Sequence, residues 1–199
     1  MATFAKTANL ILLALQSIAA SSVVVGAAVD VSTKLGGLVY VRFGRRAATA
    51  AGAGVNIRIE VSSKASGNNS WVPIAIFTTA FAAVESEAIS NAEAAGDTVI
   101  EVASTTNLVA GDLIFFDNAT IANGDFARIK SIVANVSVTL EEGLTNAQAA
   151  ATVILDGAEI YNAVAIPEGA IRLRAVADGS LFTQAFAIEV LYSTIDSIA

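Results

Sequence analysis

Residues suited to proton transfer and nucleophilic attack are scarce in this chain of 199 residues, which contains no histidine and no cysteine. General acid–base catalysis most often recruits histidine, and a serine or cysteine nucleophile needs a base beside it. Carboxylate pairs remain possible, and the candidates are Glu141–Glu142 and Glu85 with Glu87. Both pairs lie in loop-like or alanine-rich sequence, which is typical of solvated surface. We therefore predict no catalytic residues, no enzymatic activity and no small-molecule substrate.

Oxygen ligands suited to a hard cation such as Ca²⁺ gather in one stretch of the chain. They are Asp112, Asp117, Asn118, Asn123 and Asp125. Their spacing does not match an EF-hand loop, and aspartate and asparagine are also common turn residues. The chain has no glycine-rich phosphate loop with the following lysine and helix start. We expect turn chemistry here and predict no metal and no cofactor, with calcium at these loops kept as an alternative.

The charge of the chain argues against direct contact with nucleic acid. The formal net charge is −7 and the isoelectric point is about 4.5, whereas proteins that bind phosphate backbones usually carry a basic patch. The basic residues are scattered apart from Arg42, Arg45 and Arg46. We expect this cluster to form a solvated turn or an ion-pair site between subunits, and not a phosphate clamp.

The chain is unusually apolar for its size, with 55% hydrophobic and only 15% charged residues, against a typical charged fraction of about 25%. Much of the surface should therefore face a membrane, copies of the same chain or other partners. The one candidate span, Leu10–Ala28, is interrupted by polar residues and is marginal for crossing a bilayer. It also has features of a secretory signal peptide. We favour a buried or interface-forming segment and predict no membrane partner.

Two segments alternate strictly between apolar and polar residues, Asn56–Val61 and Ala170–Val176, as strands with one buried face do. Between them, residues 96–155 have a separate rhythm of short strands and turns. Pro73 removes a backbone donor, so the strand over Trp71–Thr78 either lies at a sheet edge or begins after the proline. We expect Trp71 to be a core or interface residue. The predicted fold is all-β: an N-terminal arm or short helix (1–21), a discontinuous β-sandwich (22–85 and 157–199), and an inserted small β-barrel (86–156).

Three stretches, residues 54–63, 70–79 and 166–175, resemble in their order the β-sandwich proteins of tailed bacteriophage virions. They read GVNIRIEVSS, SWVPIAIFTT and IPEGAIRLRA. The middle segment, from Gly96 to Ile132, is similar to a small β-barrel module common in phage structural proteins. The resemblance rests on strand pattern and turn residues, and it brings no functional residue with it.

This resemblance implies a non-enzymatic structural protein of the virion, assembled in the host cytoplasm. We expect a capsid decoration or cement protein that binds the phage head as an oligomer, with copies of itself and other virion proteins, the major capsid protein among them, as partners. A tail-tube, head–tail connector or other tail protein is the first alternative. An exported surface adhesin or carbohydrate-binding module is the second, and it predicts cleavage near Ala27–Ala28.

Overall fold

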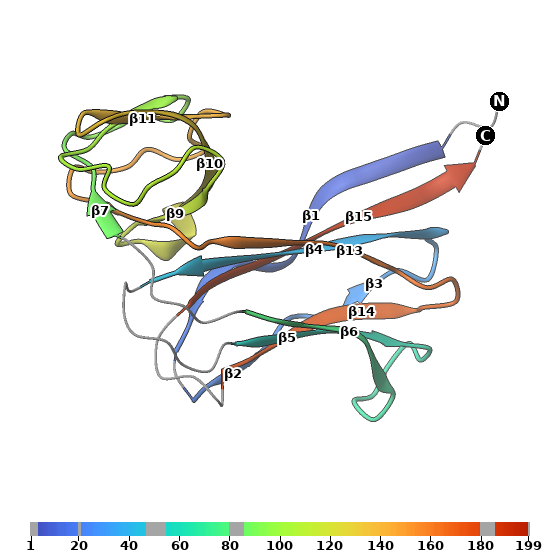
Figure 1. Ribbon diagram of the computed structural model, residues 1–199. Coiled ribbons are helices and arrows are strands. Elements are labelled where there is room, and N and C mark those ends of the chain that lie inside the picture. The colour runs from blue at the N-terminus through green and yellow to red at the C-terminus, as the bar shows by residue number, and fades with distance from the viewer. Residues whose placement is uncertain (1–3, 20, 47–54, 80–85, 180–185, 199) are drawn as a thin grey trace.

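A computed structural model describes residues 4–19, 21–46, 55–79, 86–179 and 186–198, and within these ranges the chain is all-β. These residues form fifteen strands, arranged in three sheets, and one short 3-10 helix. Two of the sheets stack as a β-sandwich, and the third curls into a separate module on the outer side of the first (Figure 1). The predicted all-β sandwich is confirmed. None of the described helices is long and apolar enough to cross a membrane.

Sheet I contains four antiparallel strands in the order β1–β15–β4–β13. Their bounds are β1 (Phe4–Ile18), β15 (Phe186–Ile198), β4 (Gly36–Arg45) and β13 (Glu159–Ala165). The first described residues therefore form the edge strand of the sandwich, where the sequence suggested an arm or short helix. Several register shifts interrupt the pairing of β1 with β15. Bulges of this kind are a common way to protect an exposed edge from pairing with another chain.

A polar cluster fastens the far end of the β1–β15 pair. The carboxylate of Asp196 on β15 accepts hydrogen bonds from Lys34 Nζ and Thr7 Oγ1, each at 2.7 Å. Thr194 Oγ1 donates to the same carboxylate at 2.8 Å. These three bonds lower the pKa of Asp196 to about 2. The carboxylate thus links β1, β15 and the loop before β4.

Sheet II has the order β2–β14–β5–β6, with β3 also paired to β14. The bounds are β2 (Val23–Val25), β3 (Val29–Asp30), β5 (Asn56–Ser62), β6 (Trp71–Thr78) and β14 (Arg172–Asp178). The two alternating segments of the sequence are thus neighbours, β5 and β14, which pair antiparallel along their whole length. The strand with Pro73 lies at the sheet edge, as predicted.

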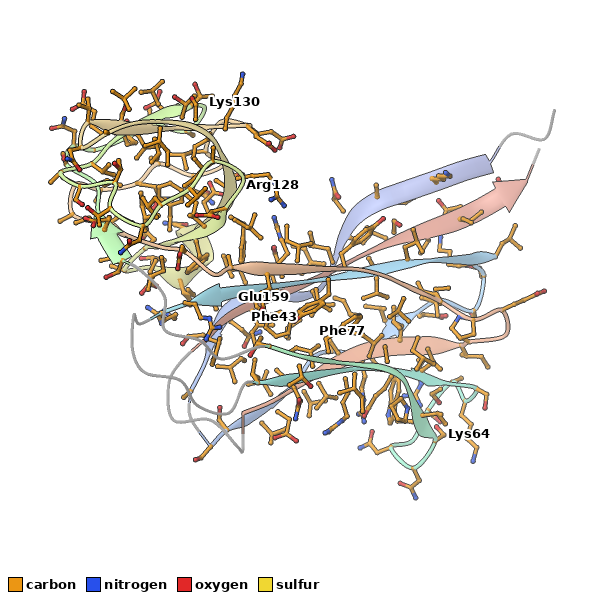
Figure 2. The ribbon with its side chains drawn as sticks, viewed as in Figure 1. Phe43, Lys64, Phe77, Arg128, Lys130 and Glu159 are labelled. Atoms are coloured by element: carbon orange, nitrogen blue, oxygen red, sulfur yellow. The ribbon has the colours of Figure 1, made fainter. Side chains whose placement is uncertain are left out.

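The sandwich core lies between the inner faces of the two sheets. Sheet I contributes Phe43 and Ile188, and sheet II contributes Ile57 and Leu173, all nearly or fully buried. The ring of Tyr161 stands edge-on to Phe43, with centroids 5.5 Å apart, and its hydroxyl is shared between Thr78 and Glu159. Figure 2 shows Phe43 and Phe77 pointing into this layer. The polar halves of both sheets consequently face outward.

The third sheet forms the barrel module (residues 86–156). Its strands, in sheet order, are β7 (Ser86–Ala88), β12 (Val153–Leu155), β9 (Leu113–Asp117), β10 (Asp125–Val133), β11 (Ser137–Leu140) and β8 (Val99–Glu101). A bridge between Ile89 and Val102 joins the two edges, so the sheet curls round its own core. A short 3-10 helix, η1 (Ile121–Asn123), lies between β9 and β10.

The barrel module packs on sheet I through two neighbouring phenylalanines of β9 that point in opposite directions. Phe116 points into the barrel core. Phe115 points toward the sandwich, packs with Ala158 and Ala187, and is fully buried. A Cβ at Gly44 would lie only 2.4 Å from the Phe115 ring, so glycine is required at that position for the ring to fit. The junction is therefore a packed interface.

Candidate functional site

The predicted calcium-ligand candidates make contacts within the chain, and two of them, Asp117 and Asp125, lie in strands β9 and β10 and not in turns. Asp112 Oδ2 accepts a hydrogen bond from the Val109 amide at 2.7 Å. Asp125 Oδ2 accepts from the backbone amides of Thr145 and Asn146, at 2.5 and 3.1 Å. Within the described ranges, the acidic residues form no group of three that could hold a metal ion.

The basic cluster lies on a strand and makes contacts within the chain. Arg42 and Arg45 belong to β4, so the expected turn is wrong for them. Arg42 pairs with Glu189 of β15 and lies 5.0 Å from the Phe126 ring centroid. Arg46 pairs with Asp117 of β9 at 2.8 Å, so it joins the sandwich to the barrel module.

The predicted surface carboxylates do not come together as an acid–base pair. Glu141 and Glu142 are exposed beyond β11, and Glu141 lies 3.8 Å from Arg128. They line a pocket of about 250 Å³ at the junction, together with Arg42 and Arg128. Glu87 lies in β7, and Glu85 is outside the described ranges. The pocket holds no serine beside a base that could act as a nucleophile.

A set of paired charges lies on the outer face of sheet II, which we call the arginine–tryptophan face. It is formed by Arg58, Glu60, Trp71, Arg172, Arg174 and Asp178. Glu60 is only 7% exposed and pairs with Arg174 at 2.7 Å and with Arg58 at 3.3 Å. Arg58 also reaches Asp178 at 3.1 Å. Because two guanidinium groups neutralise Glu60, this carboxylate is not placed to act as a base.

Trp71 lies under two of the three arginines of the face. The guanidinium of Arg174 is 4.1 Å and that of Arg172 is 4.7 Å from the indole centroid. Arg172 also donates to the carbonyls of Lys64 and Gly67, at 2.6 and 2.7 Å, and so fixes the loop between β5 and β6. Cation–π contacts of this kind each contribute about 0.5–2 kcal/mol. The face is therefore ordered in the isolated chain.

Apolar side chains border the arginine–tryptophan face on both sides. Ile76 on β6 is 60% exposed, and Val23 and Val25 on β2 are both more than half exposed. In register, Val25, Val176, Arg58 and Ile76 form one row across the sheet. No other described element covers this face (Figure 1). A Trp–Arg centre with apolar margins has the composition of binding hot spots.

Sequence reasoning identified Trp71 as a core or interface residue but did not find this face as a unit. The available signal was the polar half of the two alternating segments, Arg58 and Glu60 in one and Arg172 and Arg174 in the other. Their meeting depends on the pairing of β5 with β14, which brings Glu60 opposite Arg174.

The fold therefore defines a β-sandwich with an inserted barrel module and a charged, apolar-bordered sheet face. A scan against protein-family models and a search of curated proteins both find no match. Among solved structures, the chain is similar to a conserved carbohydrate esterase from the Shiga toxin-encoding bacteriophage phi24B. The identity is 13% over 98% of this chain and 90% of the esterase, and the TM-score is 0.31.

Proposed function

We propose that this chain is a non-catalytic structural protein that assembles with copies of itself in the particle of a tailed bacteriophage, as a decoration protein of the head. The observation that carries the assembly role is the arginine–tryptophan face with its exposed apolar margins. Arginine and tryptophan are enriched where interface energy concentrates, and surrounding apolar contacts exclude water. The phage assignment rests on the resemblance of the strand and turn pattern to virion β-sandwich proteins.

Further exposed apolar residues support burial between subunits. Ile11 on the outer face of sheet I is 58% exposed and lies beside Leu191 of β15 in register. The barrel module exposes Val109, Val133 and Val136 by more than half each. The low charged fraction of the chain, 15%, fits the same interpretation, because permanent interfaces resemble a protein core cut in half.

Imaging and sedimentation of the purified protein test this proposal. Concentrated protein should form closed rings or lattice-forming oligomers in electron micrographs. It should also co-sediment with emptied phage heads from which outer proteins have been stripped. A protein that stays monomeric at every concentration and does not bind such heads would refute a decoration role. Rings that stack into tubes without binding heads would move the assignment to the phage tail.

The carbohydrate-binding alternative depends on one residue, Trp71, because sugar rings commonly stack on exposed indoles. In this structure the guanidinium groups of Arg172 and Arg174 lie over that indole and compete for the same surface. A glycan array therefore should give no signal with the wild-type protein. Binding that is lost in Trp71→Ala would favour the carbohydrate module over the assembly protein.

A further inference from the structure

The negative charge of the chain is concentrated in one part of the fold. Residues 86–156, the barrel module, contain ten acidic but only two basic residues, which gives a formal charge of −8. The rest of the chain contains eight acidic and nine basic residues, a formal charge of +1. The overall charge of −7 therefore conceals an acidic barrel on a nearly neutral sandwich.

Within the barrel module, three carboxylates gather at β8. Glu101 accepts a hydrogen bond from Asn91, and its own amide donates to Glu93 Oε1 at 3.2 Å. Partial burial raises the pKa of Glu93, and the charges of Asp97 and Glu101 raise it further. Val99 lies two residues before Glu101 on β8 and is more than half exposed. This surface combines negative charge with an apolar side chain.

The arginine–tryptophan face has the opposite character. Arg58, Arg172 and Arg174, with Lys64 in the adjoining loop, outnumber the two carboxylates of the face, Glu60 and Asp178, by four to two. Arg172 donates hydrogen bonds to the Ser62 hydroxyl and to the carbonyls of Lys64 and Gly67. A surface with excess positive charge and exposed Ile76 thus complements the β8 surface in charge and in polarity.

The two surfaces point away from each other within one chain. Sheet I lies between the barrel module and sheet II, and β11, the neighbour of β8, is on the side of the barrel farthest from the sandwich (Figure 1). Figure 2 shows Lys64 below sheet II and Lys130 at the top of the barrel module, on opposite sides of the molecule in this view. The surfaces can therefore meet only between two molecules.

We infer that copies of this chain associate head to tail, with the β8 surface of one barrel module seated on the arginine–tryptophan face of the next molecule. This inference rests on the proposed assembly function and names the contact that carries it. Two different patches meet, so the interface is heterologous and generates a ring or an open filament. Its electrostatic part weakens as salt rises, because the screening length is about 10 Å at 0.1 M and about 3 Å at 1 M.

A matched pair of substitutions tests the contact on the sheet side. Ile76→Glu places a negative charge at the margin of the arginine–tryptophan face, and it should weaken self-association by at least about tenfold. Leu35→Glu is the control, because Leu35 is 50% exposed but lies in the loop before β4, away from both surfaces of the proposed contact. On the barrel side, Glu93→Lys with Glu101→Lys should have the same effect as Ile76→Glu. Sedimentation velocity at low and high salt measures all four proteins.

Mixing the two weakened proteins distinguishes head-to-tail from two-fold association. The Ile76→Glu protein retains an intact β8 surface, and the barrel variant retains an intact sheet face, so together they should form a one-to-one dimer that grows no further. If the oligomer is as stable with Ile76→Glu and at high salt as the wild type is at low salt, the head-to-tail contact is wrong, but the proposed assembly function is not affected. A wild-type chain that remains monomeric at every concentration, even at low salt, and does not bind stripped phage heads would overturn both.

Discussion

Removal of the Phe115 ring should weaken the attachment of the barrel module to the sandwich. Phe115 is fully buried against Ala158 and Ala187, and its ring centroid is 4.9 Å from that of Phe126. Phe115→Ala therefore leaves a cavity over Gly44 and should lower the free energy of unfolding by about 3–5 kcal/mol. This is a large part of the ~5–15 kcal/mol that typically stabilises a folded domain.

Phe116→Ala is the matched control, because it removes the same ring from the adjacent residue of β9 but from the barrel core. Trp71 is the single tryptophan of the chain and lies in the sandwich, so its fluorescence reports on sandwich unfolding alone. Phe115→Ala should move the denaturant midpoint of Trp71 fluorescence to lower concentration. Phe116→Ala should mainly lower the denaturant midpoint for unfolding of the barrel module, followed by circular dichroism, and leave the Trp71 midpoint nearly unchanged.

The comparison of the two midpoints can refute this account of the junction. If Phe116→Ala lowers the Trp71 midpoint as much as Phe115→Ala does, the sandwich and the barrel module unfold as one unit, and the direction of each ring is irrelevant. If Phe115→Ala changes neither probe by more than about 1 kcal/mol, the cavity over Gly44 collapses at little cost and the junction is not a major source of stability.

Three further substitutions test single interactions. Glu60→Gln should lower the free energy of unfolding of the sandwich by about 1.5–3 kcal/mol, because it removes charge-assisted hydrogen bonds such as that from Arg174. Urea titration measures this change, and an unchanged unfolding midpoint would contradict the prediction. Asp196→Asn should abolish an acid-induced loosening of the β1–β15 pair, which hydrogen exchange of the β1 amides can follow. The pKa of Asp196 is about 2 in the folded chain and 3.8 in the unfolded chain. The stability that the ionised carboxylate contributes is therefore complete above pH 3.8 and is lost as the pH falls toward 2. Tyr161→Phe should remove an ultraviolet titration step near pH 12, because burial and the charge of Glu159 raise the pKa of Tyr161 to about 12. Since the tyrosine ionises more readily in the unfolded chain, the stability of the wild-type protein should fall above pH 10. A Tyr161 titration step near pH 10 in the folded wild-type protein would refute this.

The parts of the fold that were predictable from sequence are those with regular alternation. The segments that became β5 and β14 have one polar and one apolar residue in turn, and Pro73 correctly indicated an edge. The strand β1 was missed for a physical reason. Its bulges put consecutive residues, Leu12 and Leu13, into buried positions, so the period of two is lost in the sequence.

The candidate site was less predictable, because its contacts join residues far apart in the chain. Arg46 was predicted to lie in a solvated turn or in an ion pair between subunits, but its partner is Asp117 of the barrel module in the same chain. The arginine–tryptophan face likewise requires the register that sets Glu60 opposite Arg174, and no short-range pattern specifies that register. The individual residue types predicted no catalytic group, and the assembly of the arginines and Trp71 into one surface depends on the sheet topology.

The pairing of β15 with both β1 and β4 also determines the order in which the chain can fold. Every strand of the barrel module lies between residues 86 and 155, so this unit can close on the ribosome while later residues are still being translated. Sheet I has to wait for residues 186–198, which form its second strand. Until β15 is made, the strand that lies between β1 and β4 is missing from sheet I. The apolar residues of β1 and β4 are then exposed and can bind chaperones or mispair with other strands.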